Sequence, residues 1–392
     1  MTRSFQQNHA ARHALTTACA ALTLSAGMVG APLRAAKVPA PAQTEFVYIG
    51  TLHKQISALR FDASTGALTA LGAVAEGPKS TWVSASPHAP VLYAVDDDSA
   101  KEGSITAYAV DQHNGSLSPL GVVPTGGRGT TFLRFDAPSM TLLGANYNSG
   151  SVSSVAVNAD GSVGPLVSTL AETGDGPNRR QASAHAHGVA IDPSGRYALV
   201  ADLGADRVFV YRFDRATHAL SQDDGTRAAT FVAPPGSGPR HLEFSANGQF
   251  VYLLTELSAE VMVLRWDATQ GTLTHVQSLP ISSDGFDGVK SGAEITLGRD
   301  GRFVYVENRG ENALVVYRVK ADTGKLSLVQ RIASGGDKPW GFGIDASGRW
   351  LLVANQRSGK VNVFSIDAAS GRLADTGESA DVTDPSSVAF VK

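Results

Sequence analysis

One apolar phrase recurs seven times along the chain, and this repetition limits the possible folds more than any other feature. Each copy is a short run of residues such as Val, Leu, Tyr or Ile that ends in a small or polar residue, and the last residues of successive copies lie 46 to 56 positions apart. The copies occupy residues 46–50, 91–96, 142–146, 198–202, 251–255, 304–308 and 351–355. A period of this length is typical of arrays in which each repeat forms one small structural unit.

The residues around each run predict four short strands per repeat. A strand with alternating apolar side chains follows the run, as at 207–213 and 261–266, and a turn rich in Asp, Asn and Gly, as at 267–271, then closes a hairpin. A second turn, as at 192–195 or 345–348, precedes the run and follows another short apolar strand. Four antiparallel strands, repeated seven times, predict an all-β fold, the seven-bladed β-propeller.

The two ends of the chain predict how the ring closes. Residues 45–49 enter at the second strand of a blade, whereas residues 385–391 form an inner strand that no further strand of the same repeat follows. Pairing the N-terminal and C-terminal strands in one blade removes the exposed sheet edges that an open ring would leave. We therefore expect a closed propeller rather than an open solenoid, which would need capping repeats.

The first forty residues differ in composition from the rest and are typical of an export signal. Basic residues precede an apolar stretch of small side chains at 14–31, and alanines near residue 40 offer a cleavage site. The sequence thus predicts a signal peptide at 1–40 and one propeller domain at 41–392 in a periplasmic or secreted protein, with no stable membrane association after cleavage. An uncleaved membrane anchor and a lipid anchor at Cys19 are the alternatives. Because Cys19 is the only cysteine, the cleaved chain has no thiol for a disulfide or a nucleophile.

Charge and motif content argue against several functions. The formal net charge is −3, and no run of Lys and Arg exceeds a pair, so we do not expect nucleic-acid binding. The Gly-x-Ser-x-Gly motif of hydrolases is absent, and the glycines at 126–129 lack the strand-to-helix setting of a phosphate-binding loop. We expect a monomer that needs no cofactor and binds a small molecule.

Blade geometry brings four chemically capable side chains to one mouth of the central channel. In each blade of a propeller, the residues just before the innermost strand and those just after the second strand lie at the same mouth of the central channel. His187 and Arg240 lie eight residues before equivalent turn glycines, and Glu256 and Arg309 come one residue after the second strand. Arginine can bind a carboxylate or phosphate through two hydrogen bonds, and His and Glu can exchange protons near neutral pH. We expect these four residues, from three neighbouring blades, to form a catalytic site.

Further residues near these positions are candidates for substrate binding, although polar side chains in a propeller channel often serve structure alone. Among the tryptophans, Trp82 and Trp350 are expected to pack between blades, whereas the register of Trp340 places it at the mouth. The predicted substrate-binding residues are His185, His241, Glu294, Tyr147, Gln356 and Trp340.

Short motifs at these positions carry a family resemblance. They are 185–187, 201–204, 238–242, 255–257, 293–295, 308–310 and 354–356. Together they resemble the lactonase family of seven-bladed propellers, which includes the propeller-type 6-phosphogluconolactonase and the fungal 3-carboxy-cis,cis-muconate lactonizing enzyme. The resemblance covers essentially the whole mature chain and is strongest at 185–366. It implies opening or closing of a lactone without a metal, with the family's His, Arg, Glu and Arg at His187, Arg240, Glu256 and Arg309.

Two departures from the family pattern bear on the substrate. Trp340 follows Pro339 where family members often have arginine, and Thr296 stands where a histidine commonly follows Glu-Ile. A missing arginine and histidine at the mouth, together with export, favour a non-phosphorylated aldonolactone or a carboxylated lactone. We expect hydrolysis in which Glu256 or His187 is the general base and the two arginines bind the substrate.

Two other functions remain open from the sequence. His185 and His187, two residues apart, could belong to a metal-dependent gluconolactonase-like enzyme, although only Glu256 and Glu294 would supply carboxylates nearby. A propeller can also bind a ligand or an exported protein without catalysis, because a fold alone does not determine function.

Overall fold

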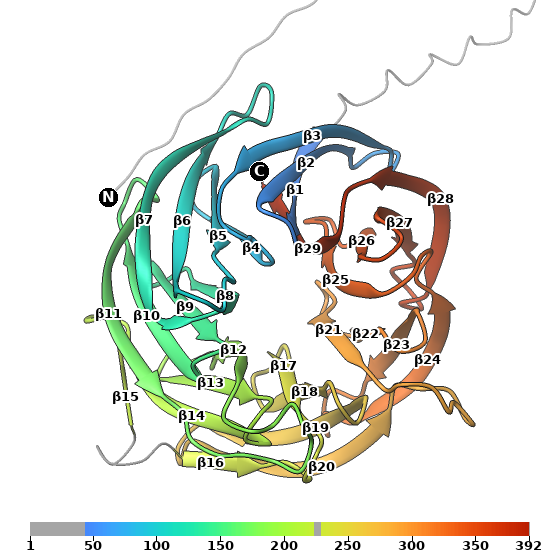
Figure 1. Cartoon of the computed structure of the whole chain (residues 1–392). Helices are drawn as coiled ribbons and strands as arrows, with labels where there is room; N and C mark the ends of the chain where they lie inside the picture. The colour runs from blue at the N-terminus through green and yellow to red at the C-terminus, as the bar shows by residue number, and fades with distance from the viewer. Residues whose placement is uncertain (1–43, 223–228, 392) are drawn as a thin grey trace, which may run out of the picture. The chain divides into compact units, whose positions relative to one another are not determined.

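The computed structural model describes residues 44–222 and 229–391, so the predicted signal peptide lies outside the described residues. The described residues form 29 β-strands, arranged as seven sheets in a ring (Figure 1). Among them, no helix is long and apolar enough to cross a membrane. The predicted seven-bladed propeller is confirmed.

Each blade is an antiparallel sheet, and in every blade except blade 1 the strands follow one another outward from the channel in chain order. Blade 1 contains β29 (Pro385–Val391), β1 (Thr44–Thr51), β2 (Gln55–Asp62) and β3 (Leu68–Glu76). Blade 2 contains β4 (Val83–Ala85), β5 (Val91–Val95), β6 (Glu102–Val110) and β7 (Leu117–Arg128). Blade 3 contains β8 (Thr130–Asp136), β9 (Thr141–Asn146), β10 (Ser151–Val157) and β11 (Val163–Ala171).

The next four blades repeat this order. Blade 4 contains β12 (Ala186–Ile191), β13 (Tyr197–Asp202), β14 (Arg207–Asp214), and two short outer strands, β15 (Ala219–Ser221) and β16 (Ala229–Val232), that both pair with β14. Blade 5 contains β17 (Pro239–Phe244), β18 (Phe250–Thr255), β19 (Glu260–Asp267) and β20 (Thr272–Pro280). Blade 6 contains β21 (Gly292–Leu297), β22 (Phe303–Asn308), β23 (Ala313–Val319) and β24 (Leu326–Ala333). Blade 7 contains β25 (Pro339–Ile344), β26 (Trp350–Asn355), β27 (Lys360–Ile366) and β28 (Leu373–Asp381).

Blade 1 closes the ring as predicted. Strand β29 pairs antiparallel with β1, with Phe46 opposite Val391 and Gly50 opposite Ser387. The blue β1 and the red β29 therefore lie side by side although they come from opposite ends of the sequence (Figure 1). This pairing supplies the inner strand that the N-terminal repeat lacks.

The core lies between the blades. The described residues contain seven hydrophobic clusters, and each joins two neighbouring sheets, including blades 7 and 1. At three of these contacts a buried tyrosine donates a hydrogen bond to a turn glycine of the next blade, at 2.9 Å for Tyr48 to the Gly115 oxygen and 3.1 Å for Tyr305 to the Gly371 oxygen. Apolar burial on both faces explains why the second strands read as continuous apolar runs.

A β-bulge near the start of the innermost strand positions the functional side chains. In six blades the pairing between this strand and the next shifts by one residue. The residues at the shift are Thr131, His187, Arg240, the pair Ala293 and Glu294, Trp340 and Ser386. A bulge re-aims the side chains next to it. As a result, consecutive residues such as Arg240 and His241 line different parts of the channel.

Candidate active site

A cavity of about 650 Å³ opens at the face of the ring where the residues preceding the innermost strands meet those following the second strands. We call it the mouth cavity. Blades 2 to 7 and the loops between them contribute to its wall. Its lining residues are Thr81, Asp97, Thr131, Tyr147, Asn178, Arg179, Arg180, His187, Arg240, Glu256, Leu257, Val289, Lys290, Ser291, Arg309, Lys338 and Trp340.

Glu256 is buried in the wall of this cavity and binds three arginines. Its Oε1 accepts from Arg180 Nη1 at 2.5 Å and lies 2.8 Å from Arg309 Nη2, while its Oε2 accepts from Arg240 Nε at 3.0 Å. Burial alone would raise the pKa of Glu256, but Arg309 and Arg240 outweigh this effect and hold the pKa well below its usual range. Glu256 is therefore ionised at neutral pH, and its carboxylate oxygens are already occupied by guanidinium groups.

His187 lies beside this ion cluster, and its imidazole is neutral. Burial lowers the pKa of His187 well below its ordinary value, and the charge of Arg240 lowers it further. The Nδ1 atom is buried without a hydrogen-bond partner, whereas Nε2 lies 3.7 Å from Oε2 of Glu256.

Trp340 supports the cationic side of the cavity. The guanidinium carbon of Arg309 lies 4.5 Å from the centre of its ring, and Nζ of Lys338 lies 5.0 Å from it, both at cation–π distance. The backbone of Lys338 has φ of 62°, a left-handed conformation that residues other than glycine rarely adopt. Its amide donates to Oδ1 of Asn312 at 2.7 Å, and its carbonyl accepts from the Gln356 amide at 2.9 Å. These two bonds hold the lysine in place at the rim.

The structure brings together the four residues predicted to be catalytic, together with two of the predicted substrate-binding residues, Tyr147 and Trp340. His185 and Gln356 do not line the mouth cavity. The ring of His185 stacks on Tyr147 with centroids 4.5 Å apart, and its Nδ1 lies 2.8 Å from the Tyr147 carbonyl oxygen. The side-chain amide of Gln356 instead donates to Oδ1 of Asp384.

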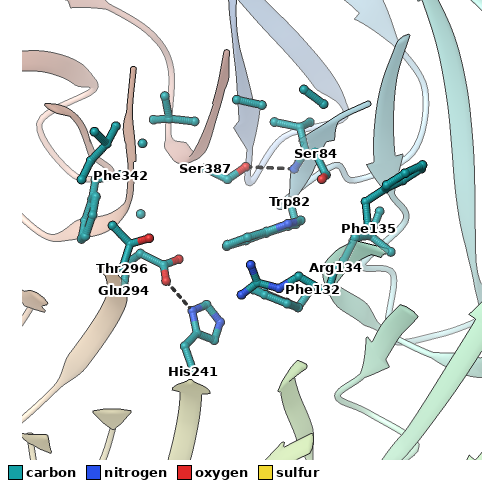
Figure 2. Close-up of a pocket in the computed structure, with 18 of the residues that line it drawn as sticks. Trp82, Ser84, Phe132, Arg134, Phe135, His241, Glu294, Thr296, Phe342 and Ser387 are labelled. Carbon is teal, nitrogen blue, oxygen red and sulfur yellow. Dashed lines mark hydrogen bonds and ion pairs between the residues drawn. The ribbon is translucent and has the colours of Figure 1, made fainter. Parts of the chain in front are cut away.

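His241 and Glu294 lie in a second cavity, of about 470 Å³, which we call the inner chamber. It is lined by the innermost strands further along the channel, and Figure 2 shows the two side chains meeting at its edge. His241 Nδ1 lies 2.9 Å from Glu294 Oε1. The bulges explain why these two residues do not line the mouth as expected. His241 follows Arg240, which lies at one bulge and faces the mouth, and Glu294 lies within another bulge.

The position of Thr296 corrects the expectation that the mouth lacks both an arginine and a histidine of the family pattern. Thr296 lines the inner chamber rather than the mouth, so a threonine there does not remove a histidine from the mouth cavity. Trp82 packs against two of the clusters between blades, as expected, and it also lines that chamber. Trp350 packs against Phe61 of blade 1, also as expected, with ring centroids 6.2 Å apart.

Sequence reasoning missed most of the positive charge at the mouth. Arg179, Arg180, Lys290 and Lys338 line the cavity in addition to the two predicted arginines, giving six basic residues against Asp97 and Glu256. With His187 neutral, the formal charge of the lining is +4. The missed residues come from loops whose lengths differ between blades, so counting from the repeats does not locate them. The adjacent pair at 179–180 was the available signal.

The two histidines suggested for a metal site both contact one tyrosine. The ring of Tyr147 contacts both, stacking on His185 and meeting the edge of His187 with centroids 5.5 Å apart. Within residues 44–222 and 229–391, no group of three or more His, Cys, Asp or Glu side chains is arranged to hold a metal ion.

Comparison with known proteins agrees with the fold. The family described as "Lactonase, 7-bladed beta-propeller" matches residues 46–390. A 6-phosphogluconolactonase of Bacillus subtilis is 31% identical over 348 residues, which are 88% of this chain and 97% of the relative. A 6-phosphogluconolactonase of Formosa agariphila is 30% identical over 80% of this chain and 88% of its own length.

Solved structures give the same result. The periplasmic gluconolactonase of Pseudomonas aeruginosa superposes with a TM-score of 0.82 at 34% identity, covering 89% of this chain and 99% of that protein. The family match spans nearly the whole described propeller, and two relatives at 30% identity or more cover most of their own length. The chain therefore belongs to the lactonase family of seven-bladed β-propellers, a family of lactone-hydrolysing enzymes.

Proposed function

We propose that the protein hydrolyses a small sugar-acid or carboxylated lactone that carries a negative charge, and that it does so without a metal ion. The observation that carries this proposal is the neutral imidazole of His187 beside an ionised Glu256 that three arginines surround. The excess of four positive charges in the mouth cavity supports an anionic substrate.

In the proposed reaction, His187 Nε2 removes a proton from water as the water oxygen attacks the lactone carbonyl carbon. Arg240 and Arg309 stabilise the negative charge that develops on the carbonyl oxygen, an effect that is strong in a buried site. The bond to the ring oxygen then breaks, and the imidazolium returns its proton to that oxygen. The product is an open-chain hydroxy acid, which ionises in solution.

We propose different roles for the two general-base candidates. Glu256 is a poor base because its low pKa and its three arginine partners favour the ionised, hydrogen-bonded carboxylate. We propose that it holds the guanidinium groups in position as a positioning residue. Arg240 is 3% exposed and lies at the base of the cavity, whereas Arg180, Lys338 and Lys290 at the rim would bind the substrate's anionic group.

Export is part of the proposal and rests on the N-terminal sequence pattern. One relative in structure is described as a periplasmic gluconolactonase. Expression with and without residues 1–40, followed by separation of periplasm from cytoplasm, tests it. Only the full-length chain should reach the periplasm, in a shortened form.

A panel of three lactones, assayed by acid release, tests the proposed activity. The compounds are glucono-δ-lactone, 6-phosphoglucono-δ-lactone and D-glucaro-1,4-lactone, which are neutral, phosphorylated and carboxylated respectively. We expect kcat/KM to be higher for the anionic lactones, to fall with rising salt, and to be unaffected by a chelator. Replacement of Lys338 by Met should weaken the preference for anionic lactones. Loss of activity with the chelator would contradict the metal-free mechanism, and no turnover of any lactone would favour a non-catalytic binding protein.

A further inference from the structure

The inner chamber has the features of a second ligand site. Its volume of about 470 Å³ falls within the range of about 300 to 1,000 Å³ that small-molecule pockets occupy. Side chains from different blades surround the space: Trp82 and Arg134 extend into it from one side, and Glu294, Thr296 and Phe342 face them from the other (Figure 2). The proposed hydrolysis uses none of these residues.

Glu294 supplies an unused hydrogen-bond acceptor to this chamber. Its side chain is 8% exposed. Oε1 accepts from the Ile295 amide at 2.8 Å and lies 2.9 Å from His241 Nδ1, but Oε2 is buried and has no hydrogen-bond partner. A buried carboxyl oxygen without a partner costs about 1 to 3 kcal/mol, more when it is charged. A hydroxyl group of a bound molecule would remove this cost.

An aromatic surface lies opposite this acceptor. The indole of Trp82 contacts Phe132, with ring centroids 4.4 Å apart, and meets the His241 ring edge-on at 5.5 Å, which fixes its orientation. Trp82 remains only partly buried and reaches into the chamber from the side opposite Glu294 (Figure 2). A flat aromatic face opposite a carboxyl acceptor suits a ring that has C–H groups on one face and hydroxyl groups at its edge.

The charge of the chamber distinguishes its ligand from that of the mouth. The chamber is lined by two arginines and two glutamates, and Arg134 donates to Glu243 at 2.8 Å. Arg299 is bound to the backbone carbonyls of Ile344 and Asp345. The formal charges balance when Glu294 is ionised and leave an excess of one positive charge when it is protonated, whereas the mouth cavity has an excess of four positive charges. The chamber therefore has little attraction for an anion.

We propose that the inner chamber is a second binding site, for a neutral hydroxylated ring of monosaccharide size that packs on Trp82 and donates a hydroxyl hydrogen bond to Oε2 of Glu294. This site is separate from the proposed hydrolysis and does not depend on it. The bulges separate the two cavities: Arg240 faces the mouth, and the next residue, His241, faces the chamber.

Binding of methyl β-D-glucopyranoside tests the proposal, because this compound has the required ring and hydroxyl groups and no lactone to hydrolyse. Saturation-transfer NMR and calorimetry should be run on the propeller and on three variants. We expect saturable binding in the millimolar range for the native protein and for Trp340→Ala, which alters only the mouth. Thr296→Phe, which fills the chamber, should abolish binding, and Glu294→Gln should weaken it at least about tenfold.

Several results would overturn this assignment. They are a lack of saturable binding to the native protein, native-like binding to Thr296→Phe, and loss of binding in Trp340→Ala alone, which would place the sugar in the mouth. Thermal unfolding of each variant shows whether it is folded. Because Thr296→Phe and Glu294→Gln change the chamber in unrelated ways, a folding defect in one leaves the other as a test. Methyl β-D-glucuronide, the carboxylated counterpart, should bind no better than the neutral glycoside.

Discussion

Arg309, in the loop after β22 of blade 6, reaches to Glu256 at the end of β18 in blade 5, and its Nη2 lies 2.8 Å from Oε1 of that carboxylate. Arg180, from the loop that precedes blade 4, binds the same oxygen. One carboxylate thus joins parts of three blades. Changes at Glu256 should therefore affect stability and catalysis together, whereas at neutral pH changes at His187 should affect catalysis alone.

Replacement of Glu256 by Gln should lower the free energy of unfolding by about 3 kcal/mol or more, because it leaves buried guanidinium charge uncompensated. Lactone turnover should be lost with it. Urea unfolding and acid-release assays measure the two effects. Glu378→Gln, an exposed control on β28, should change stability by less than about 0.5 kcal/mol. Native turnover in Glu256→Gln would contradict the positioning role.

Replacement of His187 by Gln should reduce kcat by about 10² to 10⁴, the usual contribution of a general base. The free energy of unfolding should change little, because the native imidazole is neutral and makes no hydrogen bond through Nδ1. The matched control is His275→Gln on the exposed outer strand β20, which should retain full activity. If kcat of the His187 variant stays within a few-fold of native, another group is the base.

Acid should destabilise the protein through His187. Its pKa is lowered in the folded state, so below about pH 6.5 the unfolded chain binds a proton that the folded chain does not, and stability falls by about 1.4 kcal/mol per pH unit for that group. The native protein should therefore lose more stability than His187→Gln between pH 7 and pH 5. Denaturant unfolding at both pH values measures this difference, and equal losses would refute the assignment.

Glu294 should have the opposite pH dependence. Burial raises the pKa of Glu294 from 4.5 to about 7, so the folded state holds a proton that the unfolded state has lost between these values. This contribution is fully present below about pH 4.5 and is lost as the pH rises through about 7. Between pH 5 and pH 8 the free energy of unfolding of the native protein should thus fall by about 2 to 3 kcal/mol more than that of Glu294→Gln. A constant difference between the two proteins over this range would show that Glu294 is not perturbed.

The turn glycine of blade 7 should be intolerant of a side chain. Gly371 has φ of 76°, and a Cβ there would overlap the ring of Phe303 in blade 6. Gly371→Ala should therefore lower the free energy of unfolding by more than about 1 kcal/mol. Gly377, at φ of 80° with nothing near its Cβ position, is the control that separates backbone strain from the clash. Equal losses in the two alanine variants would show that the contact with Phe303 contributes nothing.

The repeats predict the fold and part of the site because both depend on position within a blade. His187 and Arg240 occupy the same bulge position in adjacent blades, so counting from the turn glycines finds them together. Counting residues cannot show that the bulge directs the side chain of the next residue, His241, toward the inner chamber. It also cannot find Arg180, because the loop between β11 and β12 has no counterpart of equal length in the other blades. The arrangement of three arginines on Glu256 depends on side-chain conformations that no spacing encodes.

The pairing of β29 with β1 makes completion of the ring a late event in folding. Pro385 is opposite Thr51, so the contact joins residues separated by more than three hundred positions. Contacts between such distant residues form slowly because a long loop must close first. A nascent chain that ends before residue 385 can form six complete blades, but it leaves the inner edge of β1 unpaired and able to associate with other chains. A chaperone that protects this edge until residue 391 is available would favour correct assembly over aggregation.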